Sequence, residues 1–141
     1  MNGVALLRRV VNQITTHHLR TPHTPDELAS AAVGVCKTLL KTLSPLLGNV
    51  GSQALLRRSL KLTEGAFPFY GDPRLAEESG LLDAVGASLR RQKLDVAREA
   101  SIALLLTFVE LLATFIGERL TWQLLQEAWP EILTDPSQEK S

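Results

Sequence analysis

Residues 96–116 are apolar over almost their whole length, and this stretch constrains the fold more than any other part of the chain. A surface helix in water would carry a wider polar face, so the composition predicts a helix that is covered on most sides. About 20 apolar residues would also suffice to cross a bilayer. Because Arg98, Glu99 and Glu110 interrupt the run and Gly117 follows it, we expect the core helix of a soluble protein and no membrane contact.

The polar and small side chains of this helix share one narrow stripe at about 100° per residue. The stripe consists of Glu99, Ala103, Thr107, Glu110, Thr114 and Gly117. Leu105 and Phe108 lie opposite the stripe and should be buried. We expect the Glu110 carboxylate to reach water along the stripe, and the alternative is a buried acid with a raised pKa.

The remaining sequence predicts an all-α fold, because it has little β-branched alternation and many Leu, Val and Ala residues. We expect a single-domain antiparallel helical bundle over residues 1–133, with five long and one or two short helices around the central apolar helix at 96–116. A flexible C-terminal tail is expected at 134–141. Cys36 is the single cysteine and the N-terminus lacks a secretory signal, so the expected compartment is the cytoplasm.

Capping residues predict where several helices begin. Thr24 can cap a helix whose first residue is Pro25, and Glu27 lies where it can reach back to the cap. Ser44 and Pro45 repeat this arrangement. The repeat predicts a short separate helix that starts at Ser44 and that the glycine at position 48 ends.

The sequence contains no nucleophile triad, paired-carboxylate motif or nucleotide-binding fingerprint. We therefore expect a non-catalytic regulatory or adaptor module that acts through protein contacts, without a cofactor or a metal. Three alternatives from other classes remain open. They are a histidine phosphotransfer protein, a helical sensor of a small apolar ligand, and a nucleic-acid binder.

The segment His17-His18-Leu19-Arg20 resembles the His-x-Leu-Lys pattern around the phosphorylated histidine of phosphotransfer domains, which are helical bundles of similar size. The resemblance implies that His17 or His18 would accept the phosphoryl group. The competing interpretation is a pair of partly buried histidines that lie favourably at the negative end of a helix dipole. His23 is near, but no Asp, Glu or Cys lies at a matching spacing, so no metal site is expected.

Basic and aromatic side chains suggest a second candidate surface. The possible basic contact face consists of Arg8, Arg9, Arg57, Arg58 and Lys61. A loop at 66–73 carries Phe67, Phe69 and Tyr70, which could stack on single-stranded nucleic acid. The formal net charge is 0, so we expect a solvated basic face and no nucleic-acid binding. The aromatic loop is either a hydrophobic plug over the core or a contact for a ligand or partner.

The last predicted helix offers a surface for self-association. Trp122, Leu125 and Trp129 share one helix face by their i, i+3, i+7 spacing. We expect this face to stay exposed and to pair with a second copy in a homodimer. Residues 1–61 hold eight basic and two acidic side chains, whereas 62–141 hold seven basic and thirteen acidic ones, which would help to align the copies. The alternative is that both tryptophans complete the core of the protomer.

Overall fold

The computed structural model describes residues 3–71 and 80–131, and all regular structure in these ranges is helical. The predicted all-α class is confirmed. The described residues form five α-helices and one 3₁₀-helix, which are α1 (Gly3–His18), α2 (Pro25–Thr63), η1 (Pro68–Gly71), α3 (Leu81–Arg90), α4 (Leu94–Ile116) and α5 (Glu118–Ala128). The predicted tail at 134–141 and the end of the aromatic loop lie outside the described residues.

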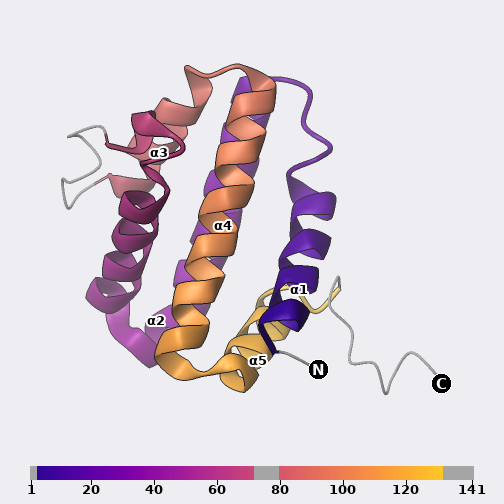
Figure 1. Ribbon diagram of the computed structural model, residues 1–141, viewed down its shortest axis with the longest axis vertical. Helices are drawn as coiled ribbons and strands as arrows, with labels where there is room; N and C mark the ends of the chain where they lie inside the picture. Colours follow the sequence, from indigo (N-terminus) through magenta and orange to yellow (C-terminus); the bar gives the residue numbers. More distant parts are fainter. Residues whose placement is uncertain (1–2, 72–79, 132–141) are drawn as a thin grey trace.

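Helix α4 contacts each of the other four α-helices. In Figure 1 it lies in front of the first half of α2, with α1 on one side and the second half of α2 on the other. Helix α3 packs mainly against α2, and α5 turns back along α4 toward α1.

Helix α2 is bent sharply at Gly48, whose φ of 77° is accessible to glycine without strain. We call residues 25–47 the first arm of α2 and residues 49–63 the second arm. The Ser44 hydroxyl donates to Oδ1 of Asn49 across this corner at 2.7 Å. The prediction of a new helix at Ser44 is wrong, because α2 continues through Pro45. Pro45 and Lys41 are both exposed, so water can serve the Lys41 carbonyl that the proline leaves without a donor.

Two local signals in the sequence did mark helix ends. The backbone N–H of Glu27 donates to the Thr24 hydroxyl at 3.1 Å, and the Glu27 carboxylate accepts from the backbone N–H of His23 at 2.9 Å. The predicted start of α2 is therefore confirmed. Gly117 ends α4 with a φ of 93°, and its N–H donates to the Ala113 carbonyl at 2.8 Å.

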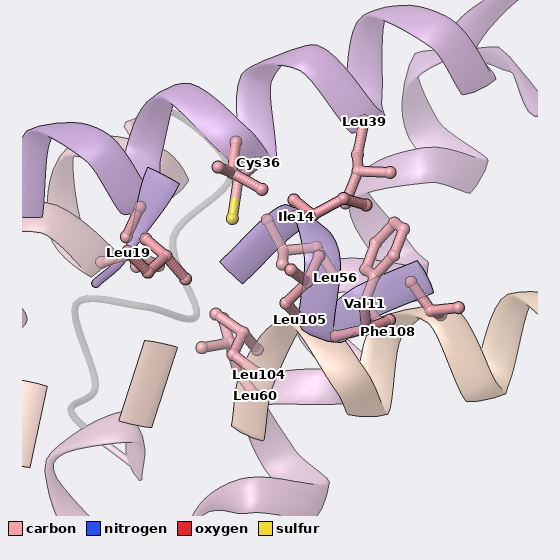
Figure 2. Packing of buried hydrophobic residues seen from close by; sticks show 14 of the residues in the cluster. Val11, Ile14, Leu19, Cys36, Leu39, Leu56, Leu60, Leu104, Leu105 and Phe108 are labelled. Atoms are coloured by element: carbon pink, nitrogen blue, oxygen red, sulfur yellow. The ribbon is translucent and has the colours of Figure 1, made fainter. Parts of the chain in front are cut away.

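The core lies between α4, α1 and both arms of α2 (Figure 2). Phe108 is only 2% exposed, and Leu105 is also buried, so the predicted orientation of α4 is confirmed. Around them lie apolar side chains from the other helices, namely Val11, Ile14, Cys36, Leu39, Leu56 and Leu60.

The expectation that α4 is covered on most sides is wrong. Its buried residues lie toward the helices that pack against it, while Ile102, Leu106 and Leu111 are half-buried. Phe115 is 71% exposed. No described helix lies in front of α4 in Figure 1. The neighbouring helices cover one side of α4, and its apolar composition alone could not reveal that the other side stays open.

Candidate functional site

The second arm of α2 and the C-terminal half of α4 border an open groove of about 420 Å³. We call it the α2–α4 groove. Thr114 also borders it, and Arg58 is the one charged residue of its lining. The other lining residues are Gly51, Ala54, Leu55, Leu111 and Phe115. Gly51 and Ala54 make a low wall on the α2 side, so the groove is mostly apolar and can admit a side chain from outside.

Phe115 is exposed because the core ends, and not because it faces away from the core. It follows Phe108 by seven residues, which returns a helical side chain to within about 20° of the same direction. Phe108 is 2% exposed and Phe115 is 71% exposed. The apolar face of α4 thus continues beyond the helices that cover it, and it ends in the α2–α4 groove.

An ion pair joins α4 to α1, on the opposite side of α4 from the α2–α4 groove. The guanidinium of Arg8 lies 3.3 Å from Oε1 of Glu110, and the Glu110 side chain is 38% exposed. The predicted access of this carboxylate to water is therefore confirmed. A second shallow groove of about 270 Å³ runs between α1 and α4, and Thr114 borders both grooves. The exposed face of α4 consequently carries charges of both signs beside apolar surface.

The predicted basic residues do not form one continuous face. Arg8 and Arg9 are exposed on α1, and Arg58 and Lys61 are exposed on the second arm of α2. Helix α4 lies between these two helices in Figure 1. Arg57 is half-buried. Two separated basic groups, one of them paired with an acid, make a poor track for a nucleic-acid backbone.

The aromatic loop packs on the protein. The Tyr70 hydroxyl donates to the Ala100 carbonyl of α4 at 2.8 Å, and Tyr70 is 3% exposed. Burial raises the pKa of this phenol well above its usual value. Phe67 and Phe69 are half-buried against the core, with ring centroids 6.1 Å apart. These contacts are those of a plug, and they leave little ring surface for stacking on a base.

His17 and His18 are the last two residues of α1. His17 is exposed, whereas His18 is half-buried with its ring 6.2 Å from that of Trp129. Burial lowers the pKa of His18, nearby His17 lowers it further, and Glu131 opposes the shift. Because Nε2 of His18 is buried, a phosphoryl donor could not reach that atom. Among the described residues, no three potential metal ligands come together.

The predicted tryptophan face is not a free surface. Leu125 is 0% exposed and Trp129 is 3% exposed, while Trp122 is half-buried. The turn at Gly117 folds α5 back so that these side chains pack on the other helices. The expectation that this face remains open is wrong, and Trp129 belongs to the protomer core.

The interior offers no room for an apolar ligand at the cavity beside Cys36. This cavity holds about 10 Å³, which is roughly the space of one water. Burial raises the pKa of the Cys36 thiol to about 12, so the sulfur stays protonated and unreactive.

Sequence reasoning missed both the α2–α4 groove and the role of Arg98. The Arg98 guanidinium donates to the carbonyls of Leu19 and Pro22 at 2.9 and 2.7 Å, which fixes the connection between α1 and α2. A lone arginine near the start of an apolar helix could have indicated such a role. The groove left a weaker signal, the small residues Gly51 and Ala54 on one helix face.

Among the described residues, α4 is the one helix whose length and composition would allow it to cross a membrane, with a mean hydropathy of 1.9. Of the 18-residue stretch that meets this criterion, 44% is buried inside the protein. No protein-family model, curated protein or solved structure matches this chain. The function is therefore inferred from the residues and their geometry.

Proposed function

We propose that this protein is a non-catalytic regulatory or adaptor module that acts through protein contacts at the α2–α4 groove. One observation carries the proposal: Phe115 is 71% exposed beside an apolar groove. Apolar surface that is contiguous and rimmed by polar groups is typical of interaction sites. Aromatic side chains are enriched at the buried centre of protein interfaces.

The chemistry of the rim favours a protein over other macromolecules. Arg58 borders the groove, and the Arg8–Glu110 ion pair borders the neighbouring groove that shares Thr114, so the surface presents both signs of charge, as in protein interfaces that select one orientation. A nucleic acid or an anionic lipid surface would favour a clear excess of positive charge, and the net charge here is 0. The buried Nε2 of His18 and the position of the exposed His17 at the end of α1, not in mid-helix, lend little support to phosphotransfer, and the small cavity beside Cys36 lends little to apolar-ligand sensing.

The proposal includes a cytoplasmic protein whose residues 1–133 form one antiparallel bundle with α4 as its scaffold, and which has no membrane contact. The burial of Phe108, Val109 and Leu112 supports this interpretation, because these apolar residues already have protein neighbours. The open side of α4 then serves to present the groove.

Site-specific photocrosslinking in host cells tests the proposed surface. Thr114 is exposed at the edge of the groove, so a photoreactive amino acid there should yield protein adducts. Ser30, exposed on the first arm of α2, is the matched control and should yield few adducts. Equal adducts at both positions, or adducts with lipid or nucleic acid alone, would contradict the proposal.

A further inference from the structure

We propose that the α2–α4 groove is occupied by Phe115 of a second copy of this chain, in a two-fold pair that also places Arg58 of each copy against the partner's Glu110. The inference rests on the proposed function, because it names the partner for the same groove. It replaces the dimer surface expected from Trp122, Leu125 and Trp129, since Leu125 and Trp129 are buried within the protomer.

Each protomer carries both halves of the required contact. In an isologous pair the same patch meets itself, so it must hold a group that inserts and a space that receives it. Phe115 is the inserting group, because its ring is largely outside the protomer. The groove of about 420 Å³ is the receiving space. An apolar cavity of ~150 Å³ already accommodates a benzene ring.

The walls of the groove suit an aromatic ring. Gly51 and Ala54 leave room on the α2 side, while Leu55 and Leu111 present aliphatic surface. Val50 precedes Gly51 at the bend of α2 and is 86% exposed, but it does not line the groove. Covering Phe115 removes from water the one aromatic ring among the exposed large apolar side chains of the described residues.

Charge complementarity favours a second copy as the occupant. Arg58 borders the groove on its α2 side, and Glu110 lies on the side of α4 that faces α1. A two-fold axis placed midway between these two side chains would exchange their positions and set opposite charges against each other twice. Arg8 contacts Oε1 of Glu110, and a carboxylate has lone pairs enough for a second guanidinium. With a net charge of 0, two copies do not repel each other at long range.

A charge-swap experiment tests this pairing. Arg58→Glu and Glu110→Lys each place like charges across both contacts of the pair, so each variant should weaken the dimer at least about 10-fold. Mixed in equal amounts, the two variants should form a heterodimer, because both contacts then join opposite charges. Sedimentation velocity at ~50 µM gives the readout, and circular dichroism verifies that both variants are folded.

Truncation of the ring supplies an independent variant. Phe115→Ala should weaken the dimer by at least about 100-fold, because each pair loses two central aromatic groups. Val96→Ala is the control, since Val96 is an exposed residue of α4 19 positions away, or ~28 Å along the helix. This control should sediment like the unmodified protein.

The outcomes separate this inference from the proposed function. A monomeric unmodified protein, or variants whose mixture remains monomeric, would overturn the second copy as the occupant. If such a monomer still crosslinks through position 114 to another protein, the proposed function stands and the inference fails. If it neither self-associates nor crosslinks to protein, both fail. Phe115→Ala that leaves the dimer intact would also overturn the inference.

Discussion

Phe108 and Phe115 point in nearly the same direction from α4, and replacing each by alanine should have very different effects on the protomer. Phe108 is 2% exposed, and a buried Phe→Ala change costs ~3–5 kcal/mol of unfolding free energy. Phe115 has less than a third of its surface covered, because it is 71% exposed. Complete burial of such a side chain contributes ~1.5–3 kcal/mol, so its loss should cost about 0.5–1 kcal/mol.

Urea unfolding followed by tryptophan fluorescence measures both changes. Both variants should be made with Arg58→Glu also present and measured at low protein concentration, so that self-association adds little to the measured free energy. In a separate thermal melt of a chain of this size, Phe108→Ala should lower the melting temperature by about 10–15 °C and Phe115→Ala by only about 2–3 °C. A Phe115 variant as unstable as the Phe108 variant would refute the view that the core ends between these residues.

Three further predictions concern contacts within the protomer. Tyr70→Phe should lower the unfolding free energy by ~1 kcal/mol in urea, because it removes the buried bond to the Ala100 carbonyl. Arg98→Met should cost ~1.5–3 kcal/mol by the same measurement, and Arg98→Lys should recover part of it through one of the two carbonyl bonds. The Cys36 pKa rises from 9.0 to about 12, so the folded state holds this proton more tightly than the unfolded chain. Stability should therefore fall above about pH 9 relative to Cys36→Ala, and iodoacetamide at pH 8 should alkylate the thiol only after unfolding.

Local signals in the sequence predicted the start of α2, the end of α4 and the facing of α4. Thr24 and Glu27 form the expected hydrogen bonds at the start of α2, and Gly117 ends α4. Phe108 is buried and Glu110 reaches water, as the spacing around α4 indicated. These features depend only on residues a few positions apart in the sequence, so they can be predicted from the sequence pattern.

Whether an apolar helix face is buried depends on how closely helices from distant parts of the sequence pack against it. A local sequence pattern cannot predict that packing. Phe108 and Phe115 have the same residue type and direction, yet only the first lies where α2 closes on α4. The i, i+3, i+7 spacing of Trp122, Leu125 and Trp129 predicts a shared helix face, but it does not say whether that face meets the core or the solvent. The turn at Gly117 returns α5 to the core and buries Trp129.

Fluorine NMR of 4-fluorophenylalanine at position 115 tests most directly whether a second copy covers this ring. The shift between solutions in H₂O and D₂O reports how much water reaches the fluorine. At ~200 µM protein we predict a small shift that grows on dilution, whereas the same label at position 108 should show a small shift at every concentration, because Phe108 is buried in the protomer. A full isotope shift at position 115 at every concentration would contradict an interface between two copies at this groove.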